Sequence, residues 1–468
     1  MTTFSSIDPA TGEIVWTGPA ATSAEIESAV GSARAAFPGW SRTPLAEREA
    51  HLRAFAGKLG ERRAELASAI SREVGKPAWE ALTEVQAMIG KVELSIKAHA
   101  RRCAEFGGGP AVTRFRPHGV VAVFGPFNFP GHLPNGHIVP ALLAGNAVVF
   151  KPSECAPLVA EITAGAWRDA GLPPGVMNLV QGARDTGAIL AAHRGLDGLF
   201  FTGSSRAGLW LAELFARTPW RILALEMGGN NPLVVWNASD LRTAALLTIQ
   251  SAYLTAGQRC SCARRLILPQ DSEGDAFLAE LRLLIATIRV GPHTDRPEPF
   301  MGPVISAKAA DEILASQQRL ADAGARVLIP ARPLRPGTGL LSPGLIDVTP
   351  ARETEDGEIF GPLLQVTRVS DFSAALAEAN RTRYGLAAGL LSDDPALYAR
   401  FRDDVRAGVI NWNQQLTGAS GEAPFGGVGM SGNHRPSAFL AADYCSYPVA
   451  SIEIPALKAP AALPAGLG

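Results

Sequence analysis

The apolar residues between positions 45 and 105 recur at helical spacing, with charged residues between them. The segment that begins LAEREAHLRAFAGKLGERRAELASAISREVG therefore predicts amphipathic helices that end at glycines. The run GGGP at 107–110 interrupts this pattern. We expect the helical segment to stop there.

Beyond the break, short apolar runs alternate with helical patterns. Strands are expected at GVVAVFG (119–125), NAVVFKPS (146–153), VMNLVQG (176–182) and LDGLFFTGS (196–204). Between and after them, GHIVPALLAG, LVAEITAGAWRDAG and RAGLWLAELFAR are expected to form helices. Such alternation indicates a parallel, doubly wound sheet. Helices on both faces explain why the strands are apolar throughout.

A second run of the same kind follows, from RILALEMGG (221–229) to AGVINWN (407–413). It contains the expected strands PLVVW and RLILP and the expected helices at 241–254 and AFLAELRLLIATI. Two α/β domains in series are therefore expected, without the fixed period of a solenoid. The tail IPALKAPAALPAGLG is rich in alanine and proline, and we expect it to be loosely ordered.

Length and charge narrow the classes of protein. The chain has 468 residues, enough for two or three domains. Lys+Arg number 43 against Asp+Glu 44, so no basic excess suggests a nucleic acid or a membrane as partner. The start MTTFSSIDPATGEIVW does not resemble a secretory signal, and a cytoplasmic location is expected.

The cysteines fit neither a disulfide framework nor a metal site. They are odd in number and widely scattered, at 103, 155, 260, 262 and 445. Zinc sites usually need paired Cys or His spacing, which this chain lacks, so no metal is expected. Elimination leaves a nucleophile in TAGQRCSCARR, the segment that holds Cys260 and Cys262.

Two strand ends carry groups that suit a nucleotide. In FFTGSSRAG, Gly203 and Gly208 are spaced G-x-x-x-x-G around Ser204, which matches neither the dinucleotide fingerprint nor a P-loop. An ordinary strand–turn–helix junction and a phosphate site both remain open. FKPSE places Lys151, Ser153 and Glu154 at the same sheet edge, where they are either ribose contacts or a solvated pair.

A series of motifs then gives a resemblance. FGPFNFP, FKPSE, FTGS, LEMGGNNP, GQRC, EIFGP and FGGVGMSG follow one another between residues 124 and 432. The series resembles that of the NAD(P)-dependent aldehyde dehydrogenases. GPFNFPGHLPNGHIVPALLAGN, TAGQRCSCARR and SGNHRPSAFLAADYC further resemble the subfamily that oxidises N-succinylglutamate 5-semialdehyde in arginine breakdown.

The resemblance implies a fold with two doubly wound α/β domains and a bridging β-element for oligomerisation. The NAD-binding domain would span 1–98 and 118–229, and the catalytic domain 230–430. The bridging element and the C-terminal tail would comprise 99–117 and 431–468. An exposed edge strand in AVTRFRPHGV suggests a homodimer or a larger homo-oligomer.

The resemblance also assigns the catalytic residues. Cys260 matches the nucleophile, Asn128 the amide that stabilises the oxyanion, and Glu226 the base that activates water. Desolvation at a strand end should raise the pKa of Glu226. A free thiol is only slightly ionised at neutral pH, so a cationic nicotinamide, nearby N–H groups or Arg259 would have to activate it. Cys262 is expected to be a packing residue.

For the cofactor, Glu358 and Phe360 match the pair that holds the nicotinamide ribose and ring. Glu154 at the adenosine ribose favours NAD over NADP. Two positions depart from the common pattern: Asn230 replaces a frequent lysine, and Phe127 replaces a tryptophan.

The implied substrate has two carboxylates besides its aldehyde, which calls for cationic or amide donors. GHLPNGH and GNHRPS supply candidates, each of which is otherwise structural: His132, Asn135, His137, His434 and Arg435. The alternatives are a dehydrogenase of another acidic semialdehyde, an enzyme that releases an acyl-CoA, and a non-catalytic relative. Glu226 argues against acyl-CoA release, and the intact catalytic residues argue against the non-catalytic relative.

Overall fold

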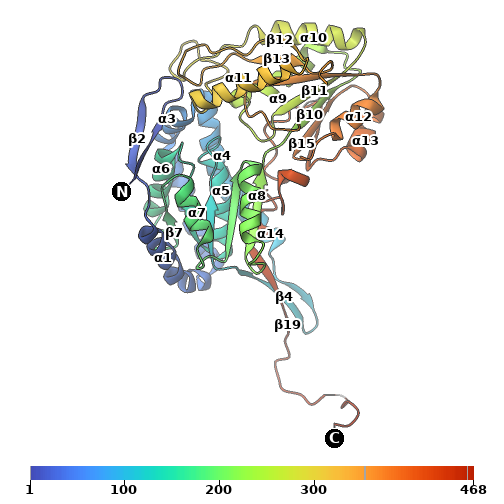
Figure 1. Cartoon of the computed structure of the whole chain (residues 1–468). Helices are drawn as coiled ribbons and strands as arrows, with labels where there is room; N and C mark the ends of the chain where they lie inside the picture. The colour runs from blue at the N-terminus through green and yellow to red at the C-terminus, as the bar shows by residue number, and fades with distance from the viewer. Residues whose placement is uncertain (1, 353–354, 461, 468) are drawn as a thin grey trace.

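The computed structural model describes residues 2–352, 355–460 and 462–467. Its first sheet has five parallel strands in the order β7-β6-β5-β8-β9 (Figure 1). Their bounds are β5 Val120–Phe124, β6 Ala147–Lys151, β7 Met177–Leu179, β8 Gly198–Gly203 and β9 Ile222–Met227. The order reverses between β5 and β8, and ligands bind beyond the carboxyl ends of strands at such a point.

Helices cover both faces of this sheet. Successive strand residues point to opposite faces, and because both sets are apolar, each face needs a layer of helices to bury it. Val121 and Val123 pack against one group of helices, and Val120 and Ala122 against the other. The first group comprises α2 Leu45–Glu61, α3 Arg63–Val74, α4 Ala78–Arg102, α5 His132–Ala144 and α6 Pro157–Asp169. The second comprises α1 Ser23–Arg42, α7 Arg184–Ala192 and α8 Ser205–Phe215.

The helices predicted over 45–105 are present, but only one of them ends at a glycine. Gly75 closes α3 in the left-handed conformation, whereas α2 ends at Arg62 and α4 at Cys103. The start of the chain contains two strands that its sequence pattern does not predict. There, β1 Thr3–Ile7 and β2 Ile14–Pro19 form an antiparallel hairpin that precedes α1.

The second sheet has seven strands in the order β12-β13-β14-β11-β10-β15-β16, with only β12 antiparallel to its neighbour. The strands are β10 Asn231–Val235, β11 Ala263–Pro269, β12 Arg326–Ile329, β13 Gly344–Asp347, β14 Leu363–Val369, β15 Ala387–Leu391 and β16 Val409–Trp412. One face packs on α9 Leu241–Tyr253, α10 Ser272–Ile285 and α11 Ala307–Asp322. The other packs on α12 Phe372–Asn380 and α13 Pro395–Asp404.

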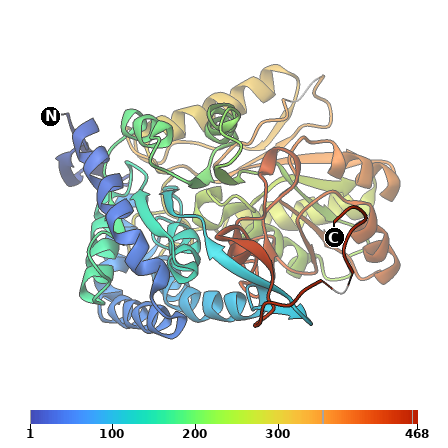
Figure 2. The ribbon, with the colours of Figure 1, turned by 90° about the horizontal axis from the view of Figure 1, so that it is seen from below.

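A third, antiparallel sheet joins distant parts of the chain. It consists of β3 Phe106–Gly108, β4 Ala111–Pro117 and β19 Ser446–Ile452, with β4 in the middle. Figure 1 shows this ribbon leaving the body of the molecule, followed by the tail, and Figure 2 shows the same ribbon from below. The predicted fold class, including the bridging β-element, is confirmed. The exact domain boundaries stay a prediction.

Shorter elements complete the site region. They are the 3₁₀ turns η1 Leu254–Gly257 and η2 Gly429–Ser431, the small hairpin of β17 Pro424–Phe425 and β18 Ser437–Ala438, and α14 Ala441–Tyr444. Among the described residues, no helix combines the length and the apolar character needed to cross a bilayer.

Candidate active site

The loop that carries Cys260 lies between α9 and β11 and has an unusual backbone. Thr255 and Ala256 in η1 have φ values of 55° and 52°, a region that residues with a Cβ rarely occupy. Asn231 at the start of β10 fixes the other end of the loop. Its Nδ2 donates to the carbonyl oxygens of Cys260 at 2.7 Å and Cys262 at 2.8 Å. The loop is therefore held from both sides.

The two neighbouring cysteines have different surroundings. Cys262 is fully buried, and its Sγ lies 3.8 Å from the carbonyl oxygen of Leu254, as expected of a packing residue. Cys260 is partly exposed and lines a cavity. Burial, with the nearby carboxylates of Glu226 and Glu358, raises the pKa of the Cys260 thiol, and Arg264 opposes this rise. The raised pKa favours the thiol form of Cys260 over the thiolate.

Arg259, one of the three sources of activation that the sequence left open, faces away from this role. Its guanidinium turns toward α4, where NH2 lies 2.8 Å from Oε1 of Glu80 and Nε donates to Oγ1 of Thr255 at 2.8 Å. Because Glu80 neutralises this charge, Arg264 is the cation that favours the thiolate of Cys260.

Asn128 lies against the cysteine loop. Its buried Nδ2 donates to the carbonyl oxygen of Gln258 at 2.9 Å, which uses one of its two hydrogens. The backbone after Asn128 is fixed by Glu84 on α4. Oε1 of Glu84 accepts hydrogen bonds from the N–H groups of Gly131 at 3.0 Å and His132 at 3.1 Å. One hydrogen of the Asn128 amide therefore stays available for a ligand.

Glu226 is the last residue but one of β9, and its side chain is buried. Neither carboxyl oxygen has a hydrogen-bond partner among the residues described. Burial raises the pKa of Glu226 well above its ordinary value. The predicted direction of the shift is confirmed, and this carboxyl group suits proton transfer near neutral pH.

Glu358 and Phe360 lie against the backbone that follows Glu226. Oε1 of Glu358 accepts from the N–H of Gly229 at 3.3 Å and from Arg264 NH2 at 3.4 Å. A Cβ on Gly228 would lie 1.7 Å from Oε2 of Glu358, so a larger residue there would displace this carboxylate. The Arg264 guanidinium lies 5.2 Å from the centre of the Phe360 ring. The Glu358 carboxylate and the Cys260 region thus share one neighbour, Arg264.

The predicted nucleotide groups meet at the carboxyl edge of the first sheet. Lys151 ends β6 and is buried, with Nζ 2.6 Å from the carbonyl oxygen of Pro152, and Glu154 is exposed nearby. Ser153 accepts a hydrogen bond from the Cys155 N–H at 3.2 Å.

Gly203 ends β8, and Ser204 caps α8 by accepting from the Ala207 N–H. An exposed carboxylate, hydroxyl groups and a helix N-terminus at one edge are a donor and acceptor set that fits a dinucleotide. Gly208 differs from its prediction, because it lies within α8, buried against β9. A Cβ there would lie 2.1 Å from Sδ of Met227, so this glycine allows close packing and does not face a ligand.

The cavity at Cys260 has a volume of about 400 Å³. One wall is a single face of α4, and the rest comes from the Asn128 loop, the cysteine loop and residues 418–438. The lining residues are Thr83, Glu84, Ala87, Gly90, Lys91, Leu94, Phe129, His132, Leu133, Arg259, Cys260, Ser261, Gly418, Ala419, Ser420, Gly421, Phe425, Ser437 and Ala438. Burial lowers the pKa of His132 well below its ordinary value, so its imidazole is neutral.

The other four substrate candidates do not line this cavity. His137 is buried, with Nδ1 2.6 Å from the Tyr444 hydroxyl and Nε2 2.8 Å from Oγ1 of Thr202, so its ring is fully used in the core. Asn135 is also buried in α5. His434 and Arg435 lie on an exposed turn with φ values of 55° and 48°. His434 and Arg435 therefore do not line the cavity at Cys260, whereas Ser437, at the end of the same motif, does.

Some residues of the site were not predicted from the sequence. Glu80, Glu84 and Lys91 interrupt the apolar stripe of α4 at buried positions. Charges on the apolar face of an amphipathic pattern were the available signal. The signal for Asn231 was weaker, because it consists only of its place directly after the Gly-Gly-Asn turn.

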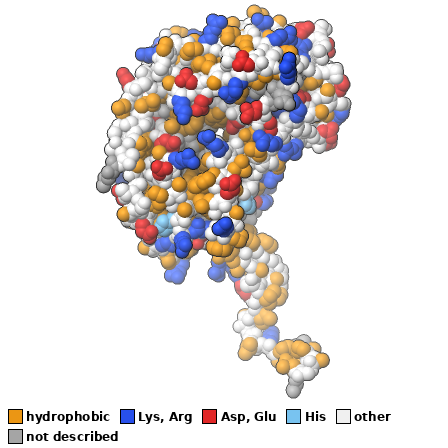
Figure 3. Space-filling model, viewed as in Figure 1, with side chains coloured by type: hydrophobic (Ala, Val, Ile, Leu, Met, Phe, Trp, Pro, Cys, Tyr) orange, Lys and Arg blue, Asp and Glu red, His pale blue; other side chains and the backbone are white. Residues whose placement is uncertain are grey.

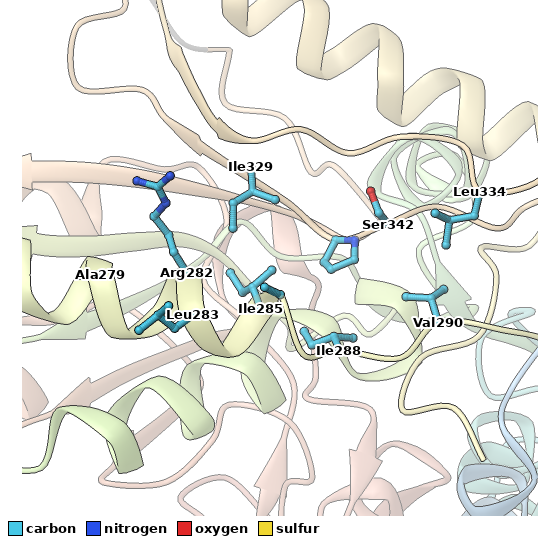
Figure 4. A pocket seen from close by; sticks show the side chains of 11 residues that line it. Ala279, Arg282, Leu283, Ile285, Ile288, Val290, Ile329, Leu334 and Ser342 are labelled. Carbon is cyan, nitrogen blue, oxygen red and sulfur yellow. The ribbon is translucent and has the colours of Figure 1, made fainter. Parts of the chain in front are cut away.

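A larger hollow lies elsewhere on the second sheet (Figure 4). It measures about 830 Å³ and is mainly apolar, lined by residues such as Leu283, Ile288 and Ile329. None of the candidate residues lies in it, so the smaller cavity is the candidate active site.

Comparisons with known proteins agree with this geometry. The profile of the aldehyde dehydrogenase family matches residues 1–447. The N-succinylglutamate 5-semialdehyde dehydrogenase of Pseudomonas fluorescens (strain Pf0-1) is 55% identical over 468 residues, which cover 99% of this chain and 96% of the relative. The enzyme of the same name from Chromobacterium violaceum is 56% identical over 464 residues, which cover 98% and 95%. The crystal structure of 1-pyrroline-5-carboxylate dehydrogenase from Thermus with bound NAD superposes with a TM-score of 0.90 at 30% identity, covering 96% of this chain and 90% of that one.

Proposed function

The chain belongs to the aldehyde dehydrogenase family, and from this premise we propose that it oxidises N-succinylglutamate 5-semialdehyde to N-succinylglutamate, a step of arginine breakdown. The observation that carries the proposal is the cavity that ends at Cys260, with Asn128 beside the same loop and Glu226 buried close by. The identity of the proposed substrate comes from the names of the two relatives at 55% and 56% identity.

In the first step, the Cys260 thiol releases its proton to solvent, which Arg264 favours, and the resulting thiolate adds to the aldehyde carbon, whose oxygen becomes an oxyanion. The free hydrogen of the Asn128 amide and the Cys260 N–H donate to this oxygen. Each such donor contributes about 3 kcal/mol to the stabilisation of the transition state. When bound, the dinucleotide supplies the acceptor for the hydride that leaves this carbon, and a thioester on Cys260 results.

In the second step, water attacks the thioester. Glu226 accepts a proton from this water, the C–S bond breaks, and the acid leaves with the thiolate restored on Cys260. A carboxyl group with a raised pKa is an effective base near neutrality, because its pKa then lies closer to the operating pH. Neither of its oxygens has a hydrogen-bond partner among the described residues, so either can accept a hydrogen bond from the water molecule.

For the cofactor, we propose NAD rather than NADP. Glu154 is exposed at the end of the β6 edge, where a carboxylate can accept hydrogen bonds from both ribose hydroxyls. A 2′-phosphate at that point would meet a like charge. The structural relative from Thermus binds NAD.

We also propose that the protein forms a homo-oligomer through its bridging ribbon. Both edge strands of this sheet, β3 and β19, have an unpaired side. The ribbon exposes Phe106 at 61%, Tyr447 at 43% and Ile452 at 70%. Figure 3 shows apolar side chains along the ribbon. Light scattering on the purified protein would test this, with a monomeric mass as the contrary result.

The proposed reaction is tested by following NADH absorbance with a panel of aldehydes. We expect N-succinylglutamate 5-semialdehyde to give the highest kcat/KM, ahead of glutamate 5-semialdehyde, succinate semialdehyde and butanal. A higher value for another acidic semialdehyde would identify that compound as the substrate and contradict the proposal.

A further inference from the structure

The cavity at Cys260 contains a buried cation that the catalytic scheme does not use. Lys91 on α4 is only 5% exposed, and it lines the cavity. Burial alone lowers the pKa of its ammonium group to about 8, with no neighbouring carboxylate acting in the opposite direction. Within the described ranges, Lys91 has no ion-pair partner. Buried charges are ordinarily paired, so this exception requires an explanation.

The two buried carboxylates on the same helix, α4, already have partners. Oε2 of Glu84 lies 2.6 Å from Nζ of Lys76, and Oε1 of Glu80 lies 2.8 Å from Arg259. Both pairs are buried, and each balances its own charge. Lys91 is therefore left as a net positive charge facing the cavity.

The position of Lys91 along α4 relates it to the length of the substrate. Glu84, which fixes the loop of the oxyanion site, lies two helical turns before it, about 10 Å along the axis. One and a half turns after it, Lys97 pairs with Glu422 at 3.6 Å, and both side chains are largely exposed. Lys91 thus lies between the reacting end of the cavity and its solvent-exposed rim.

We propose that Lys91 binds the carboxylate at the succinyl end of the substrate, an inference that rests on the proposed function. With the aldehyde at Cys260, the succinyl arm is the part that extends along α4 toward the rim. The α-carboxylate belongs to the half of the molecule that bears the aldehyde. A carboxylate on Lys91 also supplies the missing counter-charge at a buried position, where an ion pair is weakly screened.

The test compares Lys91→Met with wild type on three aldehydes. These are N-succinylglutamate 5-semialdehyde, its N-acetyl analogue, which lacks the terminal carboxylate, and butanal. We expect kcat/KM for the N-succinyl compound to fall about 10- to 100-fold, mainly through KM, as when a charge-assisted hydrogen bond is lost. The other two values should change less than about twofold. Lys97→Met, on the exposed part of the same helix, should leave all three unchanged.

Several results would overturn the assignment. An equal fall with all three aldehydes would show that Lys91 only maintains the structure. An equal fall with both acidic aldehydes would place the α-carboxylate at Lys91 instead. No fall with the N-succinyl compound would remove Lys91 from recognition. The proposed function is judged separately, from the substrate preference of the wild type, whereas Lys91 is judged from the ratio of variant to wild type.

Thermal unfolding provides a second measurement on the folded protein. Methionine fills the volume of the lysine without burying a charge, so the free variant should unfold at a higher temperature than the wild type. N-succinylglutamate should raise the unfolding temperature of the wild type and have little effect on Lys91→Met. An equal shift in both proteins would contradict the proposal.

Discussion

Replacing Glu80 with glutamine should loosen the loop that carries Cys260. Glu80 is fully buried on α4 and accepts hydrogen bonds from Arg259 and from the Thr255 hydroxyl. Thr255 is held with positive φ, so this contact stabilises a strained backbone. Glutamine keeps the hydrogen bond from Thr255 and removes the charge that Arg259 faces.

The size of the effect follows from the distance and the burial of the pair. At 2.8 Å and an effective dielectric near 20, the two charges attract by about 6 kcal/mol before desolvation is subtracted. Removing one member of a buried pair costs about 3–5 kcal/mol, because the other charge stays behind. The Arg259 side chain is 15% exposed and retains some solvent, so we expect a loss of about 3 kcal/mol in the free energy of unfolding.

A double-mutant cycle measures the pair itself. Arg259→Met combined with Glu80→Gln should cost about 2 kcal/mol less than the sum of the single changes, in urea unfolding. The kcat of Glu80→Gln should fall about 100-fold, since a displacement of about 1 Å at the nucleophile has an effect of this order. The matched control is Glu93→Gln on the same helix, whose partner is Arg53 and whose side chain is 58% exposed. It should cost less than about 0.5 kcal/mol.

Additive losses in the cycle would refute this account, because they would mean that Glu80 and Arg259 stabilise the fold independently. A normal kcat in a folded Glu80→Gln protein would show that the loop keeps its geometry without the ion pair.

Four further predictions concern single residues. Cys260→Ser should abolish dehydrogenase activity while Cys262→Ser retains most of it, and equal losses in two folded variants would refute the assignment of the nucleophile. Glu226→Gln should slow thioester hydrolysis about 10²–10⁴-fold and give one burst of NADH per site, with the acyl-enzyme visible by mass spectrometry. Wild-type kcat/KM should be higher with NAD than with NADP, and Glu154→Ala should narrow the difference; equal values in the wild type would contradict this role. Glu73 is buried and its pKa is raised from 4.5 to about 7, so between these values the unfolded chain has released a proton that the folded chain retains. Stability should therefore fall by up to about 3 kcal/mol from pH 4.5 to 7, and this slope should be absent from Glu73→Gln in denaturant titrations.

Much of the architecture could be predicted because the strands are short, apolar and separated by helical patterns. The strands expected at 119–125 and 146–153 correspond to β5 and β6, and the helix expected at 241–254 corresponds to α9. The initial hairpin was harder to predict, because apolar and polar residues alternate only partly along its strands and one strand contains Gly18. Helix ends were also less predictable, because Arg62 and Cys103 rather than glycines cap the ends of α2 and α4.

The substrate wall was harder to predict than the residues at the reacting centre. Cys260, Glu226 and Asn128 stand in compact motifs, so local sequence is enough to single them out. Lys91 and Arg435 show the opposite situation, since only packing decides which cation faces a cavity. Arg435 stands in a distinctive motif yet lies on an exposed turn, whereas Lys91 lies within an ordinary helical pattern yet faces the cavity.

The last strand and the helix before it have a consequence for synthesis on the ribosome. Tyr444 and Cys445 belong to the core of the first sheet, and β19 pairs along the whole length of β4. Asn146, next to β6, donates to the carbonyl oxygen of Cys445 at 2.7 Å. A nascent chain therefore cannot complete the core of its first sheet until residues 441–452 have left the exit tunnel. During translation, the strands of the first sheet form while part of their apolar core is still exposed. A ribosome that stalls shortly before residue 441 would therefore hold a chain with exposed apolar surface, which chaperones recognise.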